Sequence, residues 1–568
     1  MKFPSFGNIF SGTKETIERF PLTLLCVYVA TSILIWSVDR SMFSENILQL
    51  IYATIIGGLY FLSAKIICES YTLSTLHKVI IYSGAALITI GYYILFPTNL
   101  RESSMCFIWI SLGLIIIGHL LVSVVPFAFS GRSTLSFRSY NYQLLLRFGQ
   151  AVFYSLILFA TLSIALSSLD FLFDIDIKGS TYSRLFIFLA GIFNTTYFLS
   201  QFPKNFEEET YGRPKGLKVL AEYIMIPVMI IYTLILYAYI IKVIASLTGP
   251  VTEVRYMIIA FLVIGVFTYL INFFDDSEDR STLSKYYVIL FFPVASPVAI
   301  LLLLAAYNES INVGITDEIY LHSIIAIWSI GMAIYIIISK RDNIKLIPIS
   351  LIIISIISFF TPIIGVCDMT VSSQFDQVKN KIKEHKIYID NKLVRSEKTI
   401  RDSDFSNSLR YLDRYNRLDL VKALDSDNII TDTVYNYSNI SRALNIGYSN
   451  SGSKRDEKNH LKINNSSSLP IDVSEYEELI FVTNSDKNGI KTAQFVHNKN
   501  KIEIKDGMGR VIHTYDLTSQ IDSITYDTKY LLLKDESSEA KLIIHNSNID
   551  LDKKKFGYTR GVLLFRNK

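Results

Sequence analysis

The stretch that decides the fold is residues 211–243, "YGRPKGLKVLAEYIMIPVMIIYTLILYAYIIKV", a short basic segment followed by a long apolar run. Arg213, Lys215 and Lys218 come first, and between Lys218 and Lys242 the single charged residue is Glu222. About 20 apolar residues in a helix span the hydrocarbon core of a bilayer. The run therefore predicts a transmembrane helix whose basic flank lies at the lipid headgroups.

Similar apolar runs recur through the first two thirds of the chain. Only 19% of the 568 residues are charged, whereas about 25% is usual for a soluble protein. The runs predict eleven transmembrane helices, at 20–38, 47–65, 79–97, 105–128, 148–169, 182–201, 219–243, 254–274, 286–307, 318–339 and 346–366. The predicted fold is a membrane all-α bundle over residues 1–366, followed by a small soluble α+β domain.

The soluble part reads as two segments, 367–470 and 471–568. In the first, "SDFSNSLRYLDRYNRLDL" at 403–420 has apolar residues every three or four positions, which predicts an amphipathic helix capped by Ser403 with Asp404. Residues 445–470 are polar and rich in Ser and Asn, which predicts a linker. From 471 onward, short alternating runs separated by turn residues predict an antiparallel β-rich domain.

Lysine and arginine indicate the orientation, because short loops rich in them stay in the cytoplasm. Starting with the N-terminus inside, the predicted inside loops hold seventeen of these residues and the outside loops six. The first residues do not resemble a cleavable signal peptide. We therefore expect a bacterial inner-membrane protein with a cytoplasmic N-terminus and an extracytoplasmic, periplasmic C-terminal domain, provided that the number of spans is odd.

Charge and motifs exclude several classes of function. A net charge of +4 offers no strong field for nucleic acid. The chain has no recognisable catalytic, cofactor-binding or metal-binding motif, so a protein other than an enzyme is favoured and no cofactor is expected. Of the four cysteines, Cys26, Cys68 and Cys106 lie in or beside predicted spans, and Cys367 alone lies in the tail, which therefore cannot hold an internal disulfide framework.

Several blocks resemble one bacterial family. They are "RFPLTLLCVYVAT" at 19–31, the stretch at 211–243, "SKRDNIKLIPISL" at 339–351, "IDVSEYEELIFV" at 471–482 and "YTRGVLLF" at 558–565. Together they resemble the family catalogued as domain of unknown function 4153 (DUF4153), common in Bacteroidota. The resemblance implies a multi-pass inner-membrane protein and assigns no reaction. One departure lies in "YNESINVGITDEIY" at 307–320, where Ile319 stands at a position at which the family tends to have arginine.

Polar residues within the predicted spans are the candidates for a path through the membrane. Asn194, Thr195 and Thr196 lie inside the sixth predicted helix, where amides and hydroxyls can bond to a neighbouring helix. Pro293 and Pro297 lie in the ninth and are expected to kink it and free backbone carbonyls. Broken helices line substrate sites in many transporters, although packing kinks are commoner.

Glu222 belongs to the same candidate path, but its place beside the basic flank has another interpretation. It stands four residues after Lys218, so the two can share a helix face at the membrane interface. Anchoring of the helix is then the favoured role. The proposed cytoplasmic anchors are Arg213, Lys215, Lys218, Lys340, Arg341 and Lys345.

Two hypotheses of function follow. The first is a membrane-embedded binding or translocation module of the cell envelope, which handles a lipid-like or small substrate along the candidate path. The second is a membrane-anchored assembly or sensing protein, in which the extracytoplasmic β domain docks an envelope protein. The lipid bilayer is a partner in both. An integral-membrane transferase is a third reading, but it lacks a visible acid–base pair.

Overall fold

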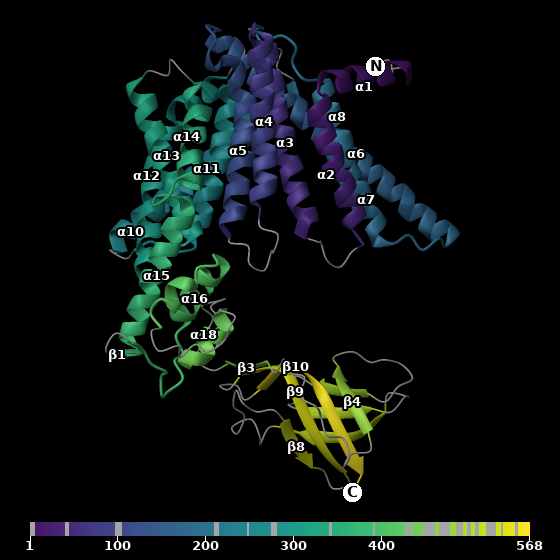
Figure 1. The fold of residues 1–568 in the computed structure, drawn as a ribbon, viewed down its shortest axis with the longest axis vertical. Helices are drawn as coiled ribbons and strands as arrows, with labels where there is room; N and C mark the ends of the chain where they lie inside the picture. The colour runs from purple at the N-terminus through teal and green to yellow at the C-terminus, as the bar shows by residue number, and fades with distance from the viewer. Residues whose placement is uncertain are drawn as a thin grey trace. The chain divides into compact units, whose positions relative to one another are not determined.

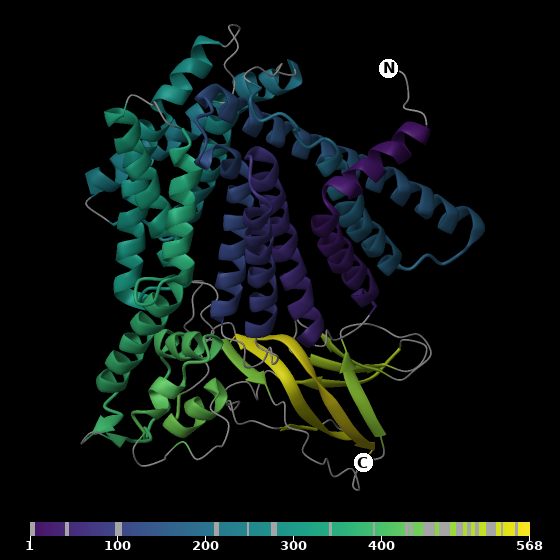
Figure 2. The same ribbon diagram turned by 45° about the horizontal axis from the view of Figure 1, so that its top comes forward.

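The computed structural model divides the chain into two compact units, residues 1–450 and 451–568. The residues that it describes are 6–39, 45–96, 105–208, 215–246, 249–273, 281–339, 344–389, 392–425, 430, 436–446, 460–464, 478–483, 492–496, 501–505, 510–517, 530–534, 538–550 and 555–567. Most of the first unit is helical, and the second contains a β-sheet (Figures 1 and 2).

The helices of the first unit are α1 (Phe6–Arg19), α2 (Pro21–Ser37), α3 (Glu45–Ser70), α4 (Thr75–Leu95), α5 (Met105–Ala128), α6 (Thr134–Phe173), α7 (Gly179–Phe188), η1 (Leu189–Phe193), α8 (Asn194–Ser200), α9 (Lys215–Lys218), η2 (Val219–Met225), α10 (Ile226–Ser246), α11 (Val254–Phe273), α12 (Thr282–Val313), α13 (Asp317–Ile338), α14 (Leu346–Phe360), α15 (Val366–Glu384), α16 (Ser403–Arg414), α17 (Asp419–Lys422) and α18 (Tyr437–Leu444). The segments η1 and η2 are π-helical. A short hairpin of β1 (Tyr388–Ile389) and β2 (Lys392–Leu393) follows α15.

Among the described residues, eight helices are long and apolar enough to cross a membrane, and a ninth is added if the bent pair α1–α2 is one span. The expected count of eleven is therefore not confirmed. The expected spans at 182–201 and 346–366 both fall on helical segments outside this set. The first is divided among α7, η1 and α8, and the second becomes the 15-residue helix α14.

Proline explains where α14 ends. Thr361, the residue before Pro362, is extended, because a proline disfavours the helical conformation in the residue that precedes it. At the other end of the chain, α1 lies crosswise to α2 in Figure 1, with a bend of 106° between them. Pro21 occupies the first turn of α2, where its missing N–H costs no helical hydrogen bond.

The membrane helices pack in a continuous series. Helix α6 contacts α7 and η1, and both of these contact α2. Helix α2 packs on α3, α3 packs on α5, and α5 packs on α14. Helices α10, α11, α12 and α13 pack on one another and complete the bundle. The largest buried cluster lies mainly in α11, α12 and α13, where the aromatic ring of Phe292 is fully buried between Tyr269 and Trp328. The bundle is therefore most tightly filled in its second half.

Basic residues of the predicted inside loops gather at one end of this bundle. Arg19 donates to the carboxylate of Glu69 at 2.8 Å and to the carbonyl of Phe202 at 3.0 Å. The Arg132 guanidinium reaches the carbonyl of Ser70 at 2.7 Å, and Lys345 donates to the carbonyl of Arg132 at 3.1 Å. These bonds join segments that are far apart in the sequence.

The helical segment after α14 has its own core. Phe405, Leu409 and Leu412 of α16 are buried there, as the amphipathic pattern predicted. The N-cap of α16 is Asp402 rather than Ser403 with Asp404, because its carboxylate accepts from the amides of Asp404 and Phe405. Burial alone would raise the pKa of Asp402. Hydrogen bonds from His385, the Phe405 amide and Lys381 outweigh this and lower the pKa to about 2.

The second unit is an eight-stranded sheet of order β3-β9-β10-β4-β5-β6-β7, with β8 paired to β9. Its strands are β3 (His460–Asn464), β4 (Glu478–Thr483), β5 (Thr492–Val496), β6 (Lys501–Lys505), β7 (Val511–Asp516), β8 (Tyr530–Lys534), β9 (Ser538–Asp550) and β10 (Lys555–Asn567). Two expectations are corrected. Strand β3 lies within the predicted linker, and the β4–β5 pair is parallel, with Val482 opposite Ala493. Alternating side chains predict a strand, but they do not specify its partner or its direction.

Candidate functional site

A cleft of about 750 Å³ lies among the membrane helices. It is lined by α2, α3, α5, α6 and the α7–η1–α8 segment. Its lining residues are Thr23, Val27, Ala30, Thr31, Leu34, Ile55, Gly58, Leu59, Leu62, His119, Val122, Ser123, Asn141, Leu144, Leu145, Phe148, Phe186, Ile187, Ala190, Gly191, Asn194, Thr195, Phe198 and Leu199. The cleft is therefore mainly apolar, with a few polar groups among the lining side chains.

Several polar groups in the cleft are positioned by hydrogen bonds within their own helix or to a neighbouring helix. The Asn194 amide donates to the Ser155 hydroxyl at 3.3 Å, and the Asn141 amide donates to the Phe137 carbonyl at 3.0 Å. His119 is bonded through Nδ1 to the carbonyl of Ile115, one turn earlier in the same helix, at 2.9 Å. Its imidazole is exposed in the cleft.

The π-helical segment η1 forms one wall of the cleft and packs closely on α2. A Cβ atom placed on Gly191 would lie well within contact of the Thr31 hydroxyl and 2.7 Å from Thr31 Cγ2. Only glycine admits this approach, so Gly191 fixes how near the wall comes to α2. A π-turn adds one residue to a helical turn and is frequent at functional sites. Here it directly precedes Asn194, the first residue of α8.

A second cavity, of about 700 Å³, lies on another face of the same α7–α8 segment. Thr196 lines it and is bonded through its hydroxyl to the Tyr28 hydroxyl at 2.8 Å. Arg19 and Lys204 stand at this cavity, each ion-paired with a glutamate, Glu69 and Glu15 respectively. Leu199 lines both cavities.

The structure thus divides the polar path predicted from the sequence. Asn194 and Thr195 line the cleft, whereas Thr196 lines the second cavity. Pro293 and Pro297 lie in α12 and are not among the residues that line either of these cavities. Helix α12 nevertheless continues through both prolines, from Thr282 to Val313.

A nearby hydroxyl bonds to the backbone carbonyl that Pro297 leaves without its helical donor. Pro297 lacks the amide that would bond to the carbonyl of Pro293, and the Ser296 hydroxyl donates to that carbonyl instead, at 2.8 Å. The Tyr237 hydroxyl of α10 donates to the adjacent Val294 carbonyl at 2.9 Å. The bond from Tyr237 joins α10 to α12 beside the two prolines.

Glu222 lies in the π-helical segment η2 and is only 2% exposed. Because η2 is not α-helical, the four-residue spacing from Lys218 does not place the two side chains as an α-helix would. Neighbouring Val219 and Tyr223 are 50% and 67% exposed. The carboxylate thus faces the interior of the bundle while its neighbours face outward.

The proposed anchors are only partly described. Lys345 has its ammonium at the Arg132 carbonyl and 5.8 Å from the centre of the Phe127 ring, and Lys218 is partly buried at the start of η2. Lys215 begins α9, although its side chain is not described. Arg213, Lys340 and Arg341 lie outside the described residues.

A buried ion pair escaped the sequence reasoning. Arg255, at the start of α11, is 1% exposed and ion-paired with Glu309 of α12. Its guanidinium also lies 3.3 Å from Nδ1 of His322 in α13. Arg255 is one of the six basic residues counted on the outside from the sequence, at the start of the predicted span 254–274. One signal could have identified the pair. Arg255 lies at the start of one predicted helix and Glu309 just after the end of the next, so the two opposite charges fall on the same side of the membrane.

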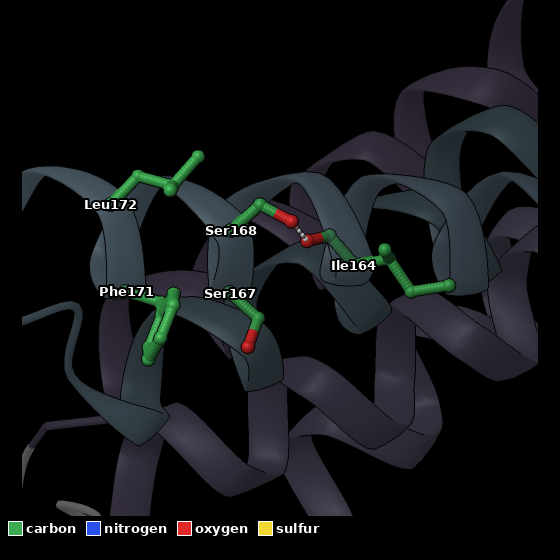
Figure 3. Close-up of a pocket in the computed structure, with 5 residues that line it drawn as sticks. All are labelled: Ile164, Ser167, Ser168, Phe171 and Leu172. Atoms are coloured by element: carbon green, nitrogen blue, oxygen red, sulfur yellow. Dashed lines mark hydrogen bonds between the residues drawn. The ribbon is translucent and has the colours of Figure 1, made fainter.

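The hollow in Figure 3, at the end of α6, is lined by Ile164, Ser167, Ser168, Phe171 and Leu172 of that single helix. Ser168 donates to the Ile164 carbonyl at 2.8 Å, so the hydroxyl serves its own helix. Within the described part of the chain, no three His, Cys, Asp or Glu side chains come together as a metal site would require.

Comparison with known proteins identifies the family of the chain. Residues 24–397 match the family model described as "Domain of unknown function (DUF4153)". The uncharacterized protein PM1469 of Pasteurella multocida (strain Pm70) is 22% identical over 257 residues, which are 44% of this chain and 41% of that protein. The chain thus aligns with less than half the length of this curated relative. No solved structure matches. Because the family model covers well over half of its residues, the chain belongs to the DUF4153 family.

Proposed function

We propose that this protein is a membrane-embedded binding module of the bacterial inner membrane and that the cleft beside η1 holds the acyl chain of a lipid-like molecule. The cleft is the single observation that carries the proposal. Its volume of about 750 Å³ falls within the roughly 300–1,000 Å³ of ligand sites. The chemistry of its lining selects the class of ligand.

The lining favours an amphiphile with an apolar chain. Most of its side chains are aliphatic or aromatic, and its polar side chains are neutral amides and hydroxyls with one histidine. A charged small solute would lose its hydration there without an opposite charge to compensate. An acyl chain has no such hydration to lose, and it can pack against the apolar side chains of the cleft.

The rim of the cleft supports entry from the lipid. Ile55, Phe148 and Phe186 line it, and they are 37%, 53% and 49% exposed. Ile55 belongs to α3 and Phe148 to α6, two of the helices long and apolar enough to span a membrane. Apolar side chains exposed at the level of such helices contact lipid. A lipid chain can therefore pass from the bilayer into the cleft without crossing water.

Photo-crosslinking tests the proposal. The purified protein would be placed in vesicles that contain a phospholipid with a diazirine on its acyl chain, and the labelled peptides would be identified by mass spectrometry. We expect strong labelling of α2, α5 and α7–α8. Thr195→Trp fills the cleft and should reduce this labelling about tenfold, which corresponds to about 1.4 kcal/mol.

A matched control separates the cleft from the general lipid-facing surface. Leu87 of α4 is 71% exposed and does not line the cleft, so Leu87→Trp should leave the labelling of α2 and α5 unchanged. Size-exclusion chromatography would check that both variants remain folded. Equal labelling of the cleft helices in wild type and in a folded Thr195→Trp variant would contradict the proposal.

The second candidate function is docking of an envelope protein by the β domain. One observation favours it: β7 is the last strand in the order of the sheet, and its Val511 and Ile512 are 49% and 43% exposed. Terminal strands with exposed apolar residues can pair with a partner strand. Charged substitutions at Val511 and Ile512 should abolish co-purification of such a partner and leave lipid labelling unchanged.

A further inference from the structure

The first turns of α5 and α15 are joined by a disulfide bond between Cys106 and Cys367. The two residues are 261 positions apart, and their Cα atoms are 5.6 Å apart, at the commonest separation for disulfides in proteins. The other two cysteines, Cys26 and Cys68, are free thiols. The pairing is therefore selective, and it links a membrane helix to the first helix of the soluble segment.

The surroundings hold the two cysteines together independently of the bond. Trp109, one turn after Cys106, donates through Nε1 to the hydroxyl of Tyr415 at 3.0 Å. Gln374, two turns after Cys367, donates to the carbonyls of Val313 and Ile315 at 2.9 and 3.2 Å. Helices α15 and α16 are thus docked on α5 and on the α12–α13 connection, so the two thiols meet without any further movement of the chain.

We propose that Cys106–Cys367 is a native disulfide formed on the extracytoplasmic side of the membrane, where it clamps the segment α15–α18 to α5. In this reaction the two thiols lose two protons and two electrons, one S–S bond forms, and a disulfide-bearing thiol oxidase of that compartment is reduced to its dithiol. The cytoplasm keeps thiols reduced, whereas the bacterial periplasm favours disulfides. The end of the bundle that carries Cys106 therefore faces the periplasm.

This assignment orients the whole protein. The end of the bundle opposite the disulfide carries the basic group of Arg19, Arg132 and Lys345, and this end then faces the cytoplasm, as the distribution of lysine and arginine favours. The argument from charge depends on whether the number of spans is odd. The argument from the disulfide does not depend on that number. It is also independent of the lipid cleft.

Counting free thiols in the full-length protein tests the bond. Cells would be quenched in acid and denatured, and the thiols would be coupled to maleimide-polyethylene glycol, each of which retards the protein on a gel. Wild type should take two tags without reductant, on Cys26 and Cys68, and four after reduction. Cys106→Ser should take three tags under both conditions, because Cys367 has lost its partner.

The double variant Cys26→Ser/Cys68→Ser is the matched control, and it should take no tag before reduction and two afterwards. Four tags on wild type without reductant would overturn the proposal. A Cys106→Ser variant that takes only two tags would also overturn the proposal.

The side of the membrane requires a second measurement. In the triple variant Cys26→Ser/Cys68→Ser/Cys106→Ser, Cys367 is the sole thiol. It should react with an impermeant maleimide that is added to intact cells after permeabilisation of the outer membrane alone. Reaction only after lysis of the inner membrane would overturn the assignment of the periplasmic side. A serine variant that fails to accumulate would be replaced by Cys106→Ala, judged by the same criteria.

Discussion

Gly191 allows a direct test of how the cleft is built. In the structure it lets η1 approach α2 so closely that a Cβ atom would overlap the Thr31 hydroxyl and lie 2.7 Å from Thr31 Cγ2. Real Cβ atoms are not found at such distances, so Gly191→Ala must displace either Thr31 or the wall itself. Thr31 is 3% exposed and its hydroxyl is bonded to the Val27 carbonyl at 2.7 Å, which leaves it little freedom to move.

The magnitude follows from two opposing terms. Overpacking of a filled interior costs about 1–3 kcal/mol, whereas replacing a glycine within a helix by alanine contributes about 0.5–1 kcal/mol of stability. We therefore expect Gly191→Ala to lower the free energy of unfolding by about 0.5–2 kcal/mol. Gly149 of α6 is the matched control, because a Cβ there meets nothing within 4 Å. Gly149→Ala should be neutral or slightly stabilising.

Unfolding would be followed by tryptophan fluorescence as detergent micelles are titrated with dodecyl sulfate. Removing the opposing atoms should rescue the variant, so Gly191→Ala/Thr31→Ala should be more stable than the sum of the two single changes predicts, by about 1 kcal/mol. If Gly191→Ala behaves like Gly149→Ala, the close contact between η1 and α2 is wrong. Destabilisation without rescue by Thr31→Ala would show that the alanine clashes with something other than Thr31.

Three other predictions concern the helical segment and α14. Asp402→Ala removes the N-cap of α16 and should cost about 0.5–2 kcal/mol, whereas Asp402→Asn keeps the cap at Oδ1 and loses the charge together with the Oδ2 acceptor of His385 and Lys381. Since the folded-state pKa of Asp402 is about 2 and its ordinary value is 3.8, the charge contributes stability above pH 3.8 and loses it as the pH falls toward 2. Wild type and Asp402→Asn should therefore differ in denaturant unfolding at pH 7 and converge near pH 2. Trp109→Phe removes the hydrogen bond to Tyr415 and should destabilise the segment by about 1 kcal/mol, seen as faster proteolysis after α14. Gly113→Ala would place a Cβ 2.8 Å from Phe359 Cβ and should lower the unfolding free energy by about 0.5–2 kcal/mol, measured by the same dodecyl sulfate titration.

Apolar runs predicted where helices lie far better than which of them cross the membrane. The run at 105–128 coincides with α5 because polar residues flank it on both sides. The run at 148–169 is only part of α6, which begins at Thr134 after the cap of Ser133. The predicted span begins after Arg138 and Arg147, and the helix itself continues through both residues.

The candidate site was harder to predict, since it depends on which helices become neighbours. Asn194 and Thr195 were identified as polar residues within a span, and they do line the cleft. Thr196 differs from Thr195 by one position, or about 100° around a helix, and therefore lies at the second cavity. Cys106 and Cys367 are 261 residues apart, so no local pattern could indicate their pairing.

The position of Glu222 shows why the spacing of residues along the chain misled the interpretation of residues 211–243. An α-helical interpretation places Glu222 on the face of Lys218, at the interface. In the structure, the backbone from Val219 to Met225 is π-helical, and a wider turn rotates the residues within it relative to those before it. Glu222 is consequently buried, while Leu220 and Ile224 remain 41% and 52% exposed. A carboxylate inside a membrane bundle is costly, and the altered turn keeps it out of contact with lipid. The same device recurs at η1, where a π-turn precedes Asn194 at the cleft. In both places, the backbone irregularity lies at or directly before a polar side chain, buried in the case of Glu222 and lining the cleft in the case of Asn194, and the composition of an apolar run contains no sign of it.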